Sequence, residues 1–142
     1  MNFRRAEKSD LSAIAAFEWC AEETSRIRKL ESSVEEGNCF IADCGGKLVG
    51  CGTISYNFFE RGFVDLLYVS ATDRRKGLGS ELLRCIESAC TTATIFTSTN
   101  LSNLPMQRLL AKDGYQIAGV VEGLDEGDPE LFYRKRLRSP KE

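Results

Sequence analysis

The chain contains a short basic loop with two glycines, Arg74-Arg75-Lys76-Gly77-Leu78-Gly79. An apolar stretch, Phe63–Val69, precedes the loop, and an amphipathic stretch that predicts a helix follows it. Glycines let backbone N–H groups turn toward a ligand, and a helix N-terminus offers unpaired N–H donors and the positive end of its dipole. The three basic side chains add positive charge. The loop therefore predicts a site for a phosphate or pyrophosphate.

The residues after the loop recur at helical spacing. The predicted apolar face of this helix carries Leu78, Leu82, Cys85, Ile86 and Ala89. The predicted polar face carries Ser80, Glu81, Arg84, Glu87 and Ser88. A basic turn before an ordinary helix is the alternative interpretation of the loop.

The glycine spacing excludes the two commonest phosphate-binding loops. A P-loop needs two glycines five positions apart, followed by Lys and Ser or Thr, and the chain has no such run. A dinucleotide-binding fingerprint needs a third glycine at the position of Leu82. The loop must therefore belong to another type of phosphate site.

The order Arg-x-x-Gly-x-Gly, from Arg74 to Gly79, resembles the signature of the GNAT superfamily of N-acetyltransferases. A second stretch, from Thr97 to Tyr115, resembles the later motif of that family, in which an asparagine opens a helix that ends in Lys-x-Gly-Phe/Tyr. The resemblance extends over nearly the whole chain. It implies one α/β (α+β) domain over residues 1–142 with the GNAT fold. That fold is a mixed central sheet of six to seven strands, with splayed fourth and fifth strands and helices on both faces.

The resemblance also implies how acetyl-CoA binds. The residues implied to hold its pyrophosphate are Arg74, Arg75, Lys76, Gly77, Leu78, Gly79 and Ser80. The residues implied to supply backbone contacts to its pantetheine arm are Leu67, Tyr68 and Val69. Asn103 and Asn100 are implied to hydrogen-bond the pantetheine or the acceptor. For Asn103, a simple helix cap is the alternative.

Asp65 is the candidate general base, because it is a carboxylate within an otherwise apolar strand. Aliphatic amines have pKa values near ~10.4 and are mostly protonated at neutral pH, so a base helps to form the attacking neutral amine. Partial burial would raise the pKa of Asp65 and make it a better base. By resemblance, several GNAT enzymes that act on small amines carry a glutamate at this position. Because aspartate is shorter, a bridging water is expected. The alternative is that Asp65 only bonds a neighbouring loop.

The sequence departs from the family pattern at Leu110. Many members carry a tyrosine four residues before the glycine that ends this helix, placed to protonate the leaving thiolate. A thiol with a pKa of about 8.5 leaves adequately without full protonation. The sequence does not choose among Tyr56, Tyr68 and Tyr133 as a replacement. For the oxyanion, a backbone N–H near Leu67 or Tyr68 suffices.

Composition limits the classes of partner. The 142 residues carry a net charge of −2, which argues against bulk electrostatic binding to nucleic acid. The basic residues 134–136 are expected on an edge strand, where positive charge blocks unwanted pairing. No apolar run approaches the ~20 residues that cross a bilayer, and the first residues are a poor secretion signal, so a cytoplasmic protein is expected.

The six cysteines predict neither a metal site nor a disulfide framework. They include no Cys-x-x-Cys pair, and the chain has no histidine to complete a mixed zinc site. Cys39, Cys51 and Cys85 lie in apolar stretches, where we expect buried free thiols.

Hydrophobic periodicity and turn residues predict the elements of one continuous unit. The predicted strands are 2–6, 38–43, 48–57, 63–69, 93–98, 115–121 and 131–137. The predicted helices run from Asp10 to about Cys20, near Glu22–Glu35, from Leu78, and from Asn103 to Gly114.

The sequence thus predicts an acetyl-CoA-dependent N-acetyltransferase that acts on a primary amine by direct attack in a ternary complex. A small-molecule amine is the expected acceptor, with its pocket near residues 20–37 and 122–130. The acidic run at 122–130 either attracts a cationic amine or is a solvated turn. The alternatives are a non-catalytic CoA-binding module and an acetyltransferase for protein lysine or N-terminal amines. A homodimer is left open.

Overall fold

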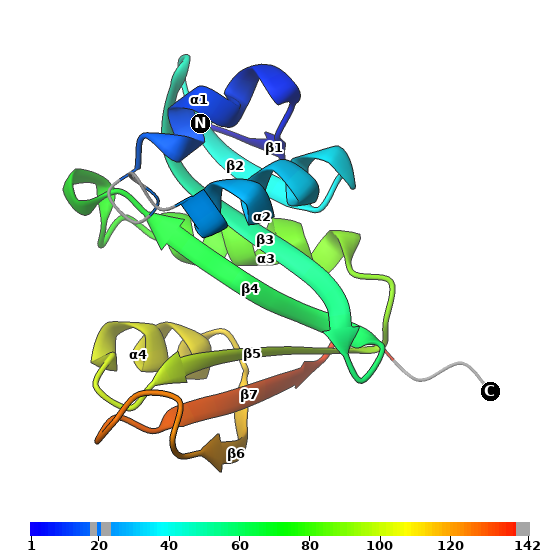
Figure 1. Cartoon of the computed structure of the whole chain (residues 1–142), viewed down its shortest axis with the longest axis vertical. Coiled ribbons are helices and arrows are strands. Elements are labelled where there is room, and N and C mark those ends of the chain that lie inside the picture. Colours follow the sequence, from blue (N-terminus) through cyan, green and yellow to red (C-terminus); the bar gives the residue numbers. More distant parts are fainter. Residues whose placement is uncertain (18–19, 21–23, 139–142) are drawn as a thin grey trace.

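The structure, a computed structural model, describes residues 1–17, 20 and 24–138. In this part of the chain, seven strands form a single mixed sheet in the order β1-β2-β3-β4-β5-β7-β6 (Figure 1). The strands are β1 (Asn2–Arg5), β2 (Cys39–Cys44), β3 (Lys47–Phe58), β4 (Arg61–Val69), β5 (Thr94–Asn100), β6 (Gln116–Val121) and β7 (Glu130–Arg136). The predicted mixed sheet is confirmed.

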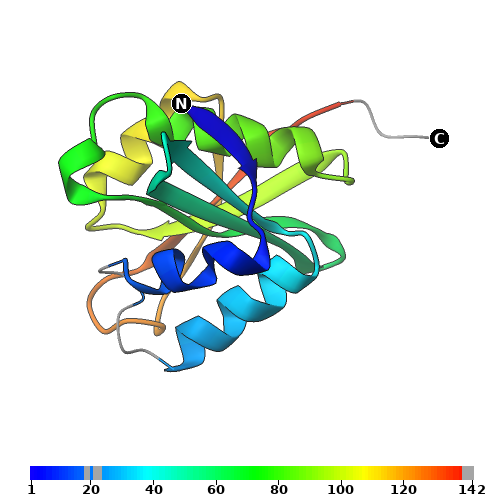
Figure 2. The same ribbon diagram turned by 90° about the horizontal axis from the view of Figure 1, so that it is seen from above.

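Helices cover both faces of the sheet, as predicted. Figure 2 shows α1 (Leu11–Ala15) and α2 (Thr24–Glu35) on one face. On the opposite face lie α3 (Leu78–Ala89) and α4 (Leu104–Lys112). Two short 3-10 turns, η1 (Lys8–Asp10) and η2 (Ala71–Asp73), precede α1 and the basic loop.

An apolar cluster fills the space between the sheet and each pair of helices. Ile86 of α3 and Leu110 of α4 are fully buried in one cluster, together with Ile95 of β5. Leu30 of α2 and Ile41 of β2 are buried in the other. Burying such side chains is the main favourable term in folding, so both faces of the sheet are held firmly.

Strands β4 and β5 are parallel but pair over only a short stretch. Their pairing runs from Gly62 opposite Ile95 to Val64 opposite Thr97. At the last paired position, Thr97 Oγ1 donates a hydrogen bond of 2.9 Å to the Val64 carbonyl. Beyond it the strands diverge, and β5 pairs along its length with β7 (Figure 1). The predicted splay is therefore present, and it opens one backbone edge of β4 to a gap.

A β-bulge interrupts β4 where the splay begins. Leu66 pairs with Thr53 and Val64 pairs with Ile54, so Asp65 is the extra residue. Side chains of a regular strand alternate between the faces, and an extra residue shifts that alternation. As a result, Asp65 and Leu66 both line a cavity on the α2 side of the sheet.

Four phenylalanines hold the closed end of the splay together. Phe58, at the end of β3, lies 5.1 Å from Phe63, 5.0 Å from Phe96 and 5.7 Å from Phe132, measured between ring centroids. These partners come from β4, β5 and β7. The cluster therefore joins strands on both sides of the gap.

The helix predicted from Asp10 to about Cys20 is shorter than expected. The helix α1 ends at Ala15, and the Phe17 N–H donates to the Ile14 carbonyl in a tight turn. This turn brings Cys20 into the core, where it is fully buried. Residues 18–19 of this prediction, and residues 22–23 of the helix predicted near Glu22–Glu35, lie outside the described residues.

Two sequence-based expectations about side-chain environments are wrong. Ser80, expected on the polar face of α3, is only 6% exposed, because the first turn of α3 packs onto the sheet. Residues 134–136 do not lie on an edge strand, because β7 is inserted between β5 and β6. There Lys135 pairs with Glu87 of α3 at 3.1 Å. The charge of Lys135 therefore links β7 to α3, whereas Arg134 and Arg136 are exposed.

The sequence predicts buried thiols at Cys39, Cys51 and Cys85, and the structure differs at Cys85 alone. Cys39 and Cys51 are fully buried, and Cys85 is half-buried. All six cysteines are free thiols. Burial raises the pKa of Cys39 to about 12, which keeps that thiol protonated and unreactive. Among the described residues, no group of three or more His, Cys, Asp or Glu side chains is arranged to hold a metal ion.

We expect Phe58→Ala to lower the free energy of unfolding by about 2 kcal/mol, because it removes a half-buried ring that contacts the rings of β4, β5 and β7. Phe59→Ala is the matched control, since that neighbouring ring is 76% exposed and meets the cluster through Phe58. Denaturant unfolding measures both variants. Equal effects of the two substitutions would contradict a structural role for the cluster.

Candidate functional site

The basic loop is open at its glycine. Gly77 has a φ of +78°, and a Cβ added there would meet no atom within 4 Å. Arg75 also has a positive φ, of 65°. Helix α3 begins at Leu78, and the first N–H groups of a helix have no partner within it. The loop therefore exposes backbone beside a helix N-terminus, as a phosphate site requires.

The loop is braced by its own side chains. Arg74 Nε donates to the Val69 carbonyl at 2.9 Å, and its guanidinium lies 5.7 Å from the centroid of the Tyr68 ring. Lys76 Nζ lies 3.6 Å from Asp73. Hydrogen bonds to Asp73, above all from Ser70, lower the pKa of its carboxyl. The phosphate-binding role of Arg74, Arg75 and Lys76 stays a prediction.

Gly79 has a packing role as well as a place in the loop. A Cβ at Gly79 would lie 2.8 Å from Leu109 Cδ1, so this glycine lets α3 approach α4 closely. The two helices are thereby set on either side of the gap beside β4. The glycine pair of the motif therefore does two things, since Gly77 leaves the loop open and Gly79 brings the helices together.

The free edge of β4 runs from Asp65 to Val69, on the side away from β3. On the β3 side, Leu67 pairs with Gly52 and Tyr68 with Cys51. The Leu67 side chain packs with the cluster under α3, and the Tyr68 ring packs against Phe17 at 5.1 Å. The side chains are thus engaged on both faces. Only alternate residues of an antiparallel strand direct their backbone groups away from the partner, and the Val69 carbonyl already accepts from Arg74, so backbone contacts of Leu67, Tyr68 and Val69 with a cosubstrate stay a prediction.

Both predicted asparagines are engaged in forming the start of α4. Asn103 caps the helix, because its Oδ1 accepts a hydrogen bond from the Met106 N–H at 3.2 Å. Asn100 Nδ2 donates to Asp125 at 2.9 Å. Asp128, from the same acidic connection, accepts from the Ser102 N–H and hydroxyl. The connection therefore anchors this loop, and contacts of Asn100 and Asn103 with a cosubstrate stay a prediction.

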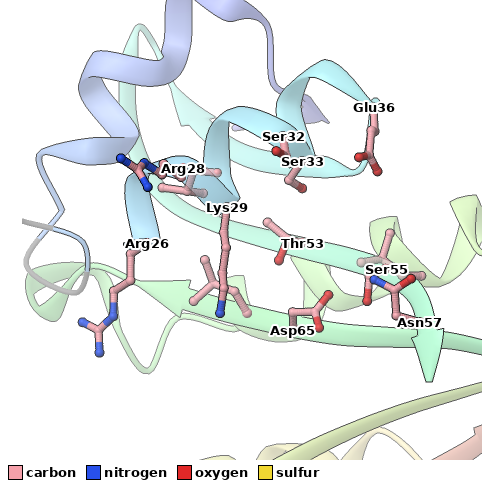
Figure 3. Close-up of a pocket in the computed structure, with 13 residues that line it drawn as sticks. Arg26, Arg28, Lys29, Ser32, Ser33, Glu36, Thr53, Ser55, Asn57 and Asp65 are labelled. Carbon is pink, nitrogen blue, oxygen red and sulfur yellow. The ribbon is translucent and has the colours of Figure 1, made fainter. Parts of the chain in front are cut away.

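A cavity of about 670 Å³ lies between α2 and strands β3 and β4 (Figure 3). Asp65 lies on its β4 wall, and Thr53, Ser55 and Asn57 follow along β3. The opposite wall includes Arg26, Arg28, Lys29, Ser32 and Ser33 of α2, and Glu36 just after it. This wall lies within the segment 20–37 that the sequence indicated for the acceptor pocket, whereas none of the described lining residues comes from 122–130.

Solvent reaches Asp65 through the cavity mouth, yet the surrounding protein still affects its charge. Desolvation raises the pKa of the Asp65 carboxyl above its ordinary value of 3.8. A hydrogen bond with Ser55 and the positive charge of Lys29 partly offset that rise. A carboxyl with a raised pKa is a stronger base once ionised, which suits proton removal from an amine.

Leu110 offers no acid, because it is a fully buried core side chain. Of the tyrosines considered as replacements, Tyr133 is only 4% exposed and burial raises its pKa. The Tyr56 hydroxyl accepts from the Thr91 N–H. Tyr68 is the one that lies on the splayed part of β4. The sequence alone could not separate these three.

A family model and the solved structures both relate this chain to the GNAT acetyltransferases. The model of the acetyltransferase (GNAT) family matches residues 4–115. A GNAT-family acetyltransferase from Bacillus cereus ATCC 10987 is 37% identical, with a TM-score of 0.89, and covers 95% of this chain and 96% of its own. Among curated proteins, none matches this sequence.

Two further solved structures share the fold at lower identity. One is yncA from Salmonella typhimurium, solved with its cofactor acetyl-CoA, at 20% identity, a TM-score of 0.80, and coverage of 100% of this chain and 96% of that one. The other is the ribosomal-protein-S18-alanine N-acetyltransferase from Escherichia coli, at 18% identity, a TM-score of 0.78, and coverage of 99% and 96%.

We expect Asp65 to bind its proton more tightly in the folded protein than in the unfolded chain, whose pKa is near 3.8. The free energy of unfolding should therefore fall as pH rises from that value through the folded pKa. Asp65→Asn should lose this pH dependence. An NMR titration of the carboxyl and unfolding curves at several pH values measure both effects. A folded pKa at or below 3.8 would contradict the burial argument.

Proposed function

The chain belongs to the GNAT acetyltransferase family and is an acetyl-CoA-dependent N-acetyltransferase, and on this premise we propose that its acceptor is a primary amine of a small molecule. The observation that carries the proposal is the position of Asp65. It lies at the start of the splay and also lines the cavity on the α2 side. An amine in the cavity can therefore approach a group held in the gap.

The residues of the gap suit acetyl-CoA. The open backbone at Gly77 and the start of α3 offer N–H donors to a pyrophosphate, and Arg75 and Lys76 add exposed positive charge. The free edge of β4 offers N–H and C=O groups to an extended amide-containing chain. Acetyl-CoA supplies the acetyl group as a thioester.

The transfer needs few protein groups. The neutral amine nitrogen forms a bond to the acetyl carbon, and the bond from that carbon to sulfur breaks, which leaves an amide and the free thiol of CoA. Asp65, directly or through one water, takes the proton from the amine. A backbone N–H near Leu67 or Tyr68 stabilises the negative charge that develops on the carbonyl oxygen. The released proton can pass on to the leaving sulfur.

The size of the cavity supports a small acceptor. A volume of about 670 Å³ lies within the range of ~300–1,000 Å³ usual for small-molecule sites. One structural neighbour is named for its action on an alanine of a ribosomal protein, so the fold alone does not fix the acceptor. Among the described residues, no helix is long and apolar enough to span a membrane. The cytoplasmic location and a homodimer stay predictions.

The buried Leu110 favours one alternative, a CoA-binding module without activity. A continuous measurement of free thiol, with acetyl-CoA and a panel of amines, distinguishes the active enzyme from the inactive module. Steady thiol release that depends on the amine supports the enzyme. Tight CoA binding without release for any amine or peptide would establish the module instead.

We expect Gly77→Glu to weaken CoA binding by about 100-fold or more, because the new carboxylate blocks the backbone and repels the pyrophosphate. Calorimetric titration with CoA measures the affinity. Gly45→Glu is the matched control, since Gly45 also has a positive φ and open space above it, in the β2–β3 turn. Unchanged affinity for the Gly77 variant would place the pyrophosphate elsewhere.

We expect Asp65→Asn to lower kcat/KM for the amine by about 100-fold or more while CoA affinity stays the same. The loss should shrink at high pH, where more of the amine is already neutral. Glu35→Gln serves as control, because that carboxylate is exposed on α2 outside the cavity. Equal rates of the Asp65 variant and the native protein across pH would remove Asp65 from the mechanism.

A further inference from the structure

We propose that the acceptor amine carries an anionic group, a carboxylate or a phosphate, and that Lys29 holds this group beside Asp65. This inference rests on the proposed function and narrows its substrate class. It starts from the charges on the cavity walls. Among the described lining residues, three are cations, Arg26, Arg28 and Lys29, and two are carboxylates, Glu36 and Asp65.

The charges are separated along the cavity. Figure 3 shows the side chains of Arg26 and Lys29 extending from α2 toward β4, with Lys29 next to Asp65. Residues three apart lie on the same face of a helix, so both side chains reach this wall of the cavity. Glu36 lies just past the C-terminal end of α2 (Figure 3). An acceptor with one positive and one negative group therefore finds a partner for each near the splay.

Lys29 has positive charge to offer a ligand. No ion pair within 4 Å involves Lys29 in the part of the chain that the structure describes. The positive charge of Lys29 acts on Asp65, whose pKa it lowers. An anionic group of the acceptor placed against Lys29 would offset that positive charge. The carboxylate of Asp65 would then be available to the amine.

The helix itself adds to the positive potential. Arg26 and Lys29 lie in the first two turns of α2, which begins at Thr24. The N-terminal end of a helix dipole favours anions and disfavours cations. The helix dipole therefore adds to the attraction between Lys29 and a bound anion.

The remaining wall is polar. Thr53, Ser55 and Asn57 line the cavity from β3, and the buried Ser33 hydroxyl has no hydrogen-bond partner among the described residues. A polar, charged acceptor suits this wall better than an apolar amine. A polyamine would instead bring further positive charge beside three cations, and like charges disfavour that arrangement.

The test compares amines that differ only in the anionic group. The first arm uses amino acids with free carboxylates against their methyl esters, and the second uses phosphoethanolamine against ethanolamine. Spermidine represents a polycation. With acetyl-CoA in excess, we expect kcat/KM to be about tenfold or more higher for the anionic member of at least one pair. Preference for the esters, for ethanolamine or for spermidine would overturn the inference.

Variants of Lys29 test the contact itself. Lys29→Gln should raise KM for the preferred anionic acceptor about tenfold, and leave KM for acetyl-CoA and for the uncharged member of the pair unchanged. Lys29→Arg should restore much of the loss. Lys112→Gln, on α4 and outside the cavity, should have no effect. An equal change for both members of the pair would overturn the role of Lys29.

The outcome also separates this inference from the proposed function. If the neutral amines are acetylated better than the anionic ones, the enzyme stands and the inference fails. If no amine yields thiol although CoA binds, the proposed function fails. The anionic members are then titrated calorimetrically into the CoA complex, and absence of binding there overturns the inference as well.

Discussion

The whole site depends on where the pairing between β4 and β5 ends. Past Val64 opposite Thr97, no further pair joins the two strands. Backbone N–H and C=O groups need partners, and the edge of β4 beyond that point has none from β5. The fold can leave this edge open because β3 holds the other side of β4 and an apolar cluster lies on each face. A stable sheet thus presents unpaired backbone to a ligand.

The bulge at Asp65 connects this gap with the cavity on the α2 side. A regular strand would have alternated the side chains from Val64 onward, and Asp65 and Leu66 would face opposite ways. With the extra residue, both reach the cavity. The phosphate loop and the cavity also differ in charge. The loop from Arg74 to Gly79, proposed to hold the pyrophosphate, is basic, whereas the cavity holds both signs.

The sequence predicted the parts that depend on local pattern. The loop from Arg74 to Gly79 and the apolar strand before it are contiguous in the chain, and the structure has both where expected. The bulge at Asp65 could not be predicted, because it depends on the register with β3. The burial of Ser80 and the interior place of β7 likewise arise from packing and pairing across the chain. The position of Lys29 beside Asp65 could not be predicted either, because it depends on how α2 packs over β4.

The phenylalanine cluster around Phe58 has a mechanical consequence. It lies at the closed end of a V whose arms are β4 and β5, and it contacts both arms. A small rotation about that apex moves the far ends of the arms by an amount that grows with their length. Packing among the four rings thus constrains the angle between β4 and β5. That angle in turn determines how far apart the two strands lie near Val69.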